Sequence, residues 1–217
     1  MIEQNFQAMR RAMVESQLRT SDVNDPVVIA AILAEPRELY VPGERRSAAY
    51  IDRAVPLGNG RELNPPLPTA RLIIEAAPRA GEKVLLIGAA TGYAAALLSR
   101  LGCTVVAVEE DAELFAQAQA QLQGREGIQL EKGPLAQGWA PSAPYDLLFI
   151  DGAVEQLGDA LIEQIKIGGR AVFARSEHGI TRLCFGTRTA GGFGARAFLD
   201  SEAVQLPGFA LPKAFSF

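Results

Sequence analysis

The stretch Val84-Leu-Leu-Ile-Gly-Ala-Ala-Thr-Gly-Tyr93 decides the fold. Residues 84–87 form a short, continuous apolar run, which is typical of a strand covered on both faces in a parallel sheet. Gly88 and Gly92 then indicate a tight turn, and residues 92–101 read as a helix. In doubly wound α/β sheets, ligands bind at the carboxyl ends of the strands, where a glycine lets them approach the backbone. We therefore expect a ligand site at this turn.

An acidic residue follows the turn at an informative distance. Glu109 comes 21 residues after Gly88, directly after a second apolar run at residues 105–108. A carboxylate at the end of that strand can accept hydrogen bonds from both hydroxyls of an adenosine ribose. The pattern favours an adenosine-containing cofactor over the structural alternative, which is a tight turn followed by a solvated glutamate.

The glycine spacing bears on which cofactor this is. A dinucleotide-binding site requires the pattern G-x-G-x-x-G to bind a pyrophosphate, whereas this turn has only two glycines, with Ala90 between them. S-adenosylmethionine has no phosphate groups and tolerates such a turn better. The sequence therefore favours S-adenosylmethionine over NAD.

Strands and helices alternate through the rest of the core. Further strands are expected at residues 105–108, 128–130, 147–150 and 171–173, and helices at residues 112–122 and 157–165. This alternation predicts a doubly wound, mostly parallel sheet with right-handed crossovers. Residues 181–188 and 196–203 flank Gly191-Gly192 with no helix between them, which predicts an antiparallel C-terminal strand pair at one edge.

The N-terminal part differs from this core. Ile2, Phe6, Met9 and Met13 recur at helical spacing, and Asp25-Pro26 is typical of a helix start. Residues 50–68 are rich in glycine and proline and are expected to form a long functional loop. We expect one domain over residues 1–217, with N-terminal helices and a substrate loop in 1–68 and the cofactor-binding α/β core in 69–217.

Composition excludes several classes of protein. The chain has 217 residues, 48% of them hydrophobic and 21% charged, as in an ordinary globular domain. A formal net charge of −4 argues against non-specific binding to nucleic acid. Cys103 and Cys184 lie far apart in the sequence, which argues against a disulfide framework or a structural zinc site. No targeting or membrane segment is recognisable, so a cytoplasmic protein without a membrane partner is expected.

Motifs spread along nearly the whole chain resemble the protein-L-isoaspartate O-methyltransferase family. They are Met13-Val-Glu-Ser-Gln-Leu-Arg19, Pro36-Arg-Glu-Leu-Tyr-Val-Pro42, Tyr50-Ile-Asp52, Pro56-Leu-Gly58-Asn-Gly60, Gly138-Trp139, Ala143-Pro144-Tyr145-Asp146, Gly168-Gly169-Arg170 and Ala197-Phe-Leu-Asp…Val204-Gln-Leu-Pro207. The resemblance implies protein repair: methyl transfer from S-adenosylmethionine to the free carboxylate of isoaspartyl residues in damaged proteins. It also implies a methyltransferase fold with N-terminal helices packed beside it.

The resemblance carries site residues onto this chain. Glu109 would hold the ribose, and Leu63 and Asn64 would face the reacting carbons as the catalytic pair. Cofactor contacts would also come from Gly88, Ala89, Ala90, Gly92 and Tyr93 on the methionine side and from Pro134 and Leu135 beside the adenine.

This chain departs from the family pattern at several of these positions. Where the family reads Gln-Thr-Ile-Ser-Gln-Pro, this chain reads Arg61-Glu-Leu-Asn-Pro-Pro66, so Asn64 replaces a serine near the acceptor carboxylate. An acidic residue and a glycine of the family's turn are replaced by Leu86 and Ala90, and its Gly-Asp-Gly after the third strand is Gly133-Pro-Leu135. Each lost polar partner in such a site costs about 1–3 kcal/mol.

Methyl transfer to a carboxylate asks for positioning rather than a general base, because the acceptor is already ionised at neutral pH. The substitutions therefore predict reduced activity or an altered substrate. Two other functions stay open: a family member without turnover that binds a peptide or protein, and a small-molecule O-methyltransferase. Asp151, at the end of a predicted strand, is the residue where a metal-dependent enzyme of that second kind would bind its cation.

Overall fold

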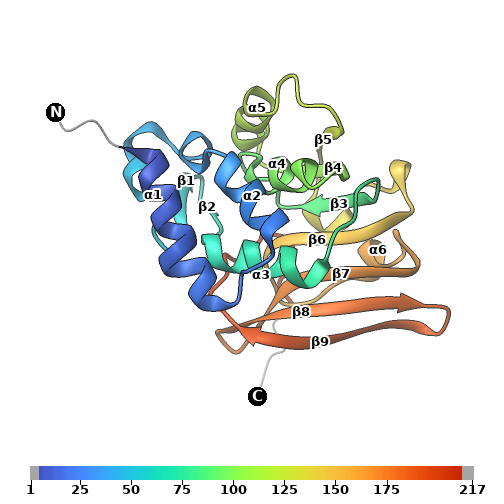
Figure 1. Cartoon of the computed structure of the whole chain (residues 1–217). Helices are drawn as coiled ribbons and strands as arrows, with labels where there is room; N and C mark the ends of the chain where they lie inside the picture. Colours follow the sequence, from blue (N-terminus) through green and yellow to red (C-terminus); the bar gives the residue numbers. More distant parts are fainter. Residues whose placement is uncertain (1–4, 212–217) are drawn as a thin grey trace, which may run out of the picture.

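A seven-stranded sheet forms the centre of the computed structural model, which describes residues 5–211 (Figure 1). Its strands lie in the order β5-β4-β3-β6-β7-β8-β9. Their bounds are β3 Lys83–Ile87, β4 Thr104–Glu109, β5 Ile128–Lys132, β6 Tyr145–Val154, β7 Ile165–Glu177, β8 Ile180–Thr189 and β9 Gly192–Asp200. The strands from β5 to β7 pair in parallel, while β8 pairs antiparallel with both β7 and β9. The predicted parallel sheet and antiparallel C-terminal pair are confirmed.

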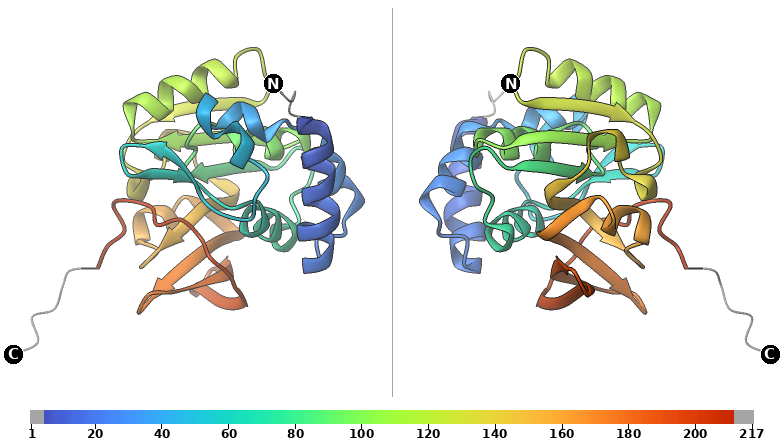
Figure 2. Two further views of the ribbon diagram at one scale, coloured as in Figure 1. Left: turned by 90° about the vertical axis from the view of Figure 1, so that its left-hand side faces the viewer. Right: turned by 90° about the vertical axis from the view of Figure 1, so that its right-hand side faces the viewer.

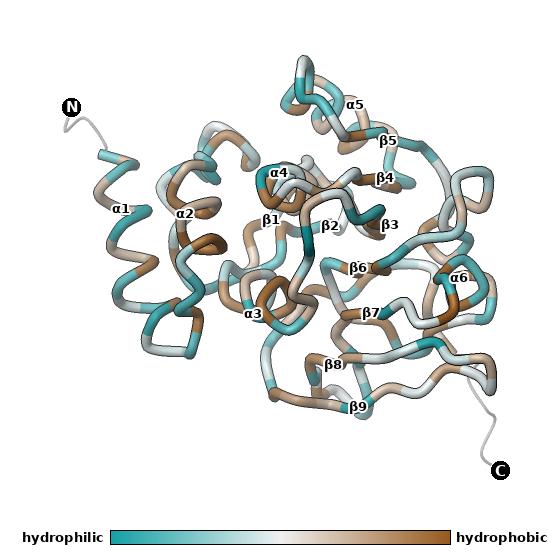
Figure 3. The backbone as a smooth tube through the Cα atoms, turned by 45° about the vertical axis from the view of Figure 1, so that its right-hand side comes forward, coloured by the Kyte–Doolittle hydropathy of each residue, from teal (hydrophilic) through white to brown (hydrophobic). Residues whose placement is uncertain are grey.

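The two faces of the sheet are covered differently. Val84 and Leu86 of β3 belong to one buried cluster, which includes residues of α1 Phe6–Met13, α2 Pro26–Ala34, α3 Pro66–Ala76, α4 Tyr93–Arg100 and α5 Ala112–Gln121. Leu85 and Ile87 belong to the other cluster, which contains the short α6 Asp159–Ile162 and residues after β9. Figure 2 shows α1 to α3 on one side of the sheet and α6 on the other. Hydrophobic residues concentrate on the central strands and on the helices beside them (Figure 3). This double burial is why the strand sequences are continuously apolar.

The N-terminal helices begin and end as their sequence predicts. The Asp25 side chain accepts hydrogen bonds from the N–H groups of Val27 and Val28, and Pro26 occupies the first turn of α2. The α1 helix continues through a wider π-helical turn, Val14–Leu18, whose buried Val14 and Leu18 extend the apolar stripe. Ile2, the first residue of the predicted stripe, lies outside the described residues.

The prediction of an irregular loop over residues 50–68 is wrong. Strands β1 Val55–Gly58 and β2 Arg61–Leu63 form an antiparallel hairpin, and α3 begins at Pro66. Asn59 and Gly60 take φ values of 51° and 71°, the left-handed conformation that a two-residue hairpin turn requires. Of the prolines read as loop signals, Pro66 and Pro68 lie in the first turn of α3, where a missing N–H costs nothing, and Pro56 lies in β1. The expected division of the single domain into an N-terminal part, 1–68, and a core, 69–217, falls within α3.

The predicted helix over residues 157–165 is also too long. Only α6, four residues, is helical, and β7 starts at Ile165, which pairs with Tyr145 of β6. The helix therefore ends earlier than the apolar pattern of the sequence predicts, because the chain from Ile165 onwards pairs with the sheet. None of the helices formed by residues 5–211 has the length and hydrophobicity needed to span a bilayer.

Candidate functional site

The order of the strands reverses at β3, whose neighbours β4 and β6 lie on opposite sides of it. In open α/β sheets, ligands bind where such a reversal leaves space outside the carboxyl ends of the strands. Here those ends are marked by Gly88 after β3 and Gly152 within β6. We call this place the switch point.

The turn after β3 is held by backbone hydrogen bonds. The N–H groups of Gly88 and Ala89 donate to the carbonyl of Val108 on β4, at 3.2 and 3.1 Å. Gly92 then caps α4 with a φ of 102°, and Ala90 has a φ of 49°. Gly92 suits its conformation, whereas Ala90 carries a Cβ in a left-handed backbone that L-residues disfavour. The turn therefore has positive φ values at Gly88 and Gly92, and also at Ala90, where the family has a glycine.

Glu109 ends β4 beside this turn and is completely buried. Its Oε2 accepts a hydrogen bond from the Ala90 N–H at 2.7 Å, and its Oε1 accepts from the N–H groups of Glu110 and Asp111, both at 3.0 Å. Backbone donors therefore fix the carboxylate at the tip of the strand, as the sequence predicts.

The β1–β2 hairpin adds a cation to this carboxylate. Arg61 of β2 donates from Nη1 to Oε1 at 2.5 Å and from Nη2 to Oε2 at 3.0 Å of Glu109. The Arg61 side chain is only 7% exposed. With the three backbone donors, the two carboxylate oxygens accept five hydrogen bonds, which uses the roughly four lone-pair sites of a carboxylate completely.

Leu206, in the segment after β9, covers the switch point. A methyl group added to Gly88 would lie 3.0 Å from Leu206 Cδ1, and one added to Gly152 would lie 2.7 Å from Leu206 Cγ. The backbone around Leu206 is tied to β6, because Ala153 N–H donates to Val204 O and Leu206 N–H donates to Ala153 O. All residues from Gly88 to Tyr93 are buried. The leucine thus fills the space directly outside β3 and β6.

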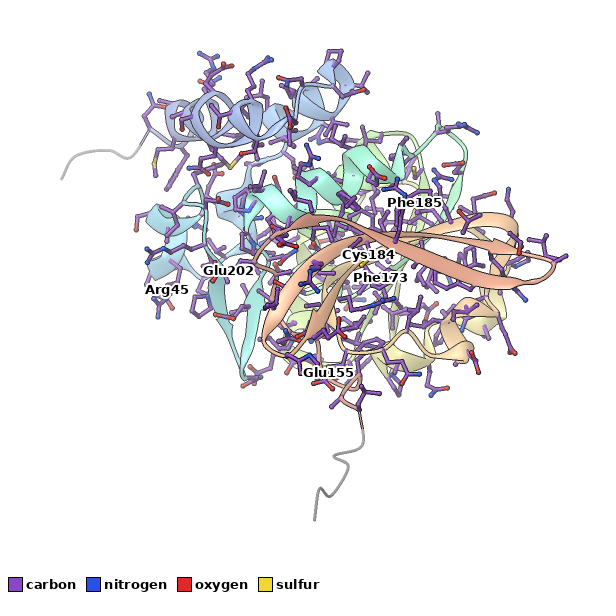
Figure 4. The ribbon with its side chains drawn as sticks, turned by 90° about the horizontal axis from the view of Figure 1, so that it is seen from below. Arg45, Glu155, Phe173, Cys184, Phe185 and Glu202 are labelled. Atoms are coloured by element: carbon purple, nitrogen blue, oxygen red, sulfur yellow. The ribbon has the colours of Figure 1, made fainter. Side chains whose placement is uncertain are left out.

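Two open grooves flank the hairpin. The first, about 550 Å³, is lined by the hairpin tip with Arg61, by Glu110 and Asp111, and by residues 205–207. The second, about 590 Å³, lies between the hairpin and the segment after β9 and is lined by Arg53, Glu62, Pro65 and Glu202 among others. Figure 4 shows Glu202 on the hairpin side of the molecule. The first groove borders the switch point, since both Arg61 and Leu206 line it.

Asn64 follows β2 and lies at the centre of a buried polar cluster. Its side-chain Nδ2 donates to Asp151 Oδ1 at 3.0 Å, and its Oδ1 accepts from the Val204 N–H at 3.1 Å. The Thr69 hydroxyl also donates to Asp151 Oδ1, at 2.7 Å. Burial raises the pKa of Asp151, against the hydrogen bonds from Thr69 and Asn64, which lower it. The amide predicted to face an acceptor carboxylate is therefore bonded to a carboxylate of the chain itself.

Arg37 supports this cluster from below and is itself fully buried. Its Nη2 donates to the carbonyl of Asn64 at 2.6 Å and its Nε to the carbonyl of Ala49 at 2.8 Å. The guanidinium also lies over the ring of Tyr93, 4.8 Å from its centroid. Arg37 therefore fixes the backbone at Asn64 and joins it to the start of α4.

Comparison with known proteins places this geometry in a family. A model described as Protein-L-isoaspartate(D-aspartate) O-methyltransferase matches residues 8–183. Protein-L-isoaspartate O-methyltransferase 1 of Rhodopseudomonas palustris (strain HaA2) is 36% identical over 189 residues, which is 86% of this chain and 77% of that protein. The enzyme of that name from Methanoculleus marisnigri is 37% identical over 165 residues, 75% of each chain.

The chain belongs to the protein-L-isoaspartate O-methyltransferase family.

Solved structures agree with this at the level of the fold. One protein-L-isoaspartate O-methyltransferase matches with a TM-score of 0.78 and 21% identity, over 94% of this chain and 66% of that one. Another, from Plasmodium falciparum in complex with S-adenosyl-L-homocysteine, also has a TM-score of 0.78, at 15% identity over 94% of this chain and 99% of that one.

The switch point fits an adenosyl cofactor in part. The glycine turn and the buried Glu109 are suited to a ribose and a methionine chain, as in the sequence prediction. Arg61 and Leu206 are not, because one uses both oxygens of Glu109 and the other fills the space outside Gly88. S-adenosylmethionine, the cofactor of this family, therefore needs both side chains to move before it can bind at the switch point.

The remaining predicted site residues differ in burial and in the side chains they contact. Leu63, Ala89 and Leu135 are buried, and Leu135 belongs to the core beneath the sheet with Leu206. Pro134 is exposed. The ring of Tyr93 packs edge-on against Tyr40, with centroids 5.4 Å apart, and so turns towards the N-terminal elements.

Sequence reasoning missed Arg37, Arg61, Thr69 and Leu206. Arg37, Arg61 and Leu206 stand inside segments that carry the family resemblance or its departures, but no local pattern shows which side chains they meet. Within the described chain, no three histidine, cysteine, aspartate or glutamate side chains gather in a way that could hold a metal ion. Asp151 is bonded to Asn64 and Thr69 instead.

Proposed function

We propose that this chain catalyses the reaction of its family: methyl transfer from S-adenosylmethionine to the free carboxylate of isoaspartyl residues in proteins. Family membership across residues 8–183 supports this, and one observation carries it. Glu109 is retained, buried and held by backbone donors at the tip of β4, next to the glycine turn. A carboxylate so placed is what an adenosine ribose requires.

The residues around Asn64 are proposed to serve the acceptor. An ionised carboxylate needs no general base, so the protein has only to position it and exclude water. Arg37 and the Val204 N–H fix the backbone and side chain of Asn64, whose amide can donate to an acceptor carboxylate in place of Asp151. We propose that the acceptor peptide lies in the groove between the hairpin and the segment after β9. Glu62 and Glu202 line that groove with Arg53 and leave it an excess of one negative charge, so a peptide with basic residues beside the isoaspartyl site suits it better than an acidic one.

Three contacts must give way before this reaction runs. Arg61 has to release Glu109, and the Asn64 amide has to release Asp151. The segment carrying Leu206 also has to move away from Gly88 and Gly152. A ligand that binds only an open minority of molecules has its apparent affinity reduced by the open fraction. We therefore expect weak cofactor binding and slow turnover.

A second candidate is a binding module without turnover. The observation favouring it is that both binding residues are already satisfied by the chain: Glu109 by Arg61, and Asn64 by Asp151. Such a protein keeps the family fold and the acceptor groove but not the cofactor.

Methyl incorporation separates the two candidates. The purified chain is incubated with methyl-labelled S-adenosylmethionine and an isoaspartyl peptide, with the aspartyl peptide of identical sequence as control. Incorporation into the isoaspartyl peptide alone supports the methyltransferase, and E109A is expected to abolish it, whereas the exposed R45Q is not. No incorporation at millimolar cofactor, together with binding of the peptide, supports the module.

A further inference from the structure

We infer that Arg61 takes the place of the cofactor's ribose diol and thereby sets how tightly this chain binds adenosyl ligands. The inference rests on the proposed function only in naming S-adenosylhomocysteine, the demethylated cofactor product, as the probe. It concerns the residue that departs from the family's glutamine in the motif before Asn64.

The two sets of donors compete for the same atoms. A ribose presents two neighbouring hydroxyls to a carboxylate, and a guanidinium presents two parallel N–H groups. Arg61 uses one N–H on each oxygen of Glu109, at 2.5 and 3.0 Å. The other acceptor sites of Glu109 face backbone N–H groups that belong to the turn after β3 and to the two residues that follow β4. A ribose can therefore be bound only where Arg61 now lies.

The hairpin holds Arg61 in this position. Its tip residue Asn59 donates from Nδ2 to Asp111 Oδ2 at 3.1 Å and to Glu113 Oε2 at 3.2 Å, on the segment that follows Glu109. Arg61 is also a strand residue, paired with Gly58 across the turn. The contacts of Asn59 are exposed and weak, whereas the pair between Arg61 and Glu109 is buried and is screened little by solvent. The buried pair is thus the main barrier to opening this side of the site.

Glutamine at position 61 removes that barrier with little change in shape. The neutral amide of glutamine has a shorter side chain and cannot form the charged, bidentate pair that a guanidinium forms with a carboxylate, so it competes less well with a ribose diol. We expect R61Q to bind S-adenosylhomocysteine about tenfold or more tightly than the unmodified chain, because the open fraction rises. R61K keeps the charge but lacks the paired N–H groups, and its affinity is expected to lie between the two.

Calorimetric titration with S-adenosylhomocysteine tests this on the full chain, R61Q, R61K and the exposed control R45Q. Thermal unfolding of each variant without ligand establishes that it is folded, and R61K supplies a folded variant if R61Q is too unstable. A second titration uses the 2′-deoxy analogue of the same ligand. R61Q should lose affinity for that analogue, whereas a variant that merely loosened the fold would treat both ligands alike.

The outcomes are distinct from those that test the reaction. The inference is overturned if neither R61Q nor R61K binds S-adenosylhomocysteine more tightly than the unmodified chain, or if R61Q does not discriminate the deoxy analogue. If R61Q binds the ligand tightly and methylates no isoaspartyl peptide, the inference stands and the proposed function fails. If the unmodified chain methylates such a peptide and R61Q binds S-adenosylhomocysteine no more tightly, the proposed function stands and the inference about Arg61 fails.

Discussion

Removing either partner of the buried pair between Arg61 and Glu109 should destabilise the fold strongly, and removing both should cost less than the sum. In R61Q, Glu109 keeps three backbone donors and loses two charged ones. Leaving one buried charge without its partner costs about 3–5 kcal/mol, and because the backbone donors remain we expect about 3 kcal/mol. In E109Q, an amide N–H faces groups that are all donors, so we expect about 4 kcal/mol.

The double variant R61Q/E109Q leaves no buried charge at this position. We expect its destabilisation to fall about 2 kcal/mol short of the sum of the single changes, within the range of measured couplings between contacting residues. Urea unfolding of the four proteins, followed by circular dichroism at neutral pH, gives the coupling energy directly. Because both side chains are buried, the coupling should persist when salt is raised.

Additive single changes, within about 0.5 kcal/mol, would refute the reasoning. Such a result means that the guanidinium and the carboxylate are not in contact in solution. The ribose position would then be free, and the inference about Arg61 would lose its structural basis.

Two further predictions concern stability. Burial alone would raise the pKa of Glu35, but hydrogen bonds from Arg125, Tyr40 and Arg100 outweigh it and hold the pKa below its ordinary 4.5. A carboxyl group whose pKa is lower in the folded than in the unfolded chain stabilises the fold at pH values above the unfolded pKa, and this stabilisation is lost as the pH falls through the folded pKa. E35Q should therefore lower the free energy of unfolding by about 3 kcal/mol at pH 7 and by progressively less below about pH 4.5. Urea unfolding at a series of pH values checks this, and a difference that does not change with pH contradicts it. Ala90 has a φ of 49°, which glycine adopts without strain, so A90G should raise the free energy of unfolding by up to about 1 kcal/mol. A89G, in the same turn but without a positive φ, should lower it. Chemical denaturation measures both, and a loss of stability in A90G contradicts the prediction.

The amino-acid sequence predicts the elements whose signals are local. The apolar run before Gly88, the glycines of the turn and the acidic residue after the next strand are each recognisable within about one βαβ unit. The antiparallel pair around Gly191-Gly192 is recognisable for the same reason, because a hairpin is a local structure. Where a local signal has two meanings, as the prolines at 65, 66 and 68 do, sequence reasoning chose a loop and missed the start of α3.

The site differs because its decisive contacts join distant parts of the chain. Glu109 could be placed at a strand tip from its spacing, but its partner Arg61 is 48 residues away and lies on a hairpin that had been predicted as a loop. Asn64 bonds to Asp151, 87 residues away, and Leu206 covers Gly88 from the segment after the last strand.

The sequence by itself thus determined the sheet, its edge hairpin, the glycine turn and the family, because hydrophobic period and turn chemistry act between near neighbours. Only the tertiary structure decided what stands in the ligand position, because that depends on which charged and apolar side chains the completed fold brings to one place. There, Arg61 takes both oxygens of Glu109 and Leu206 packs against Gly88 and Gly152.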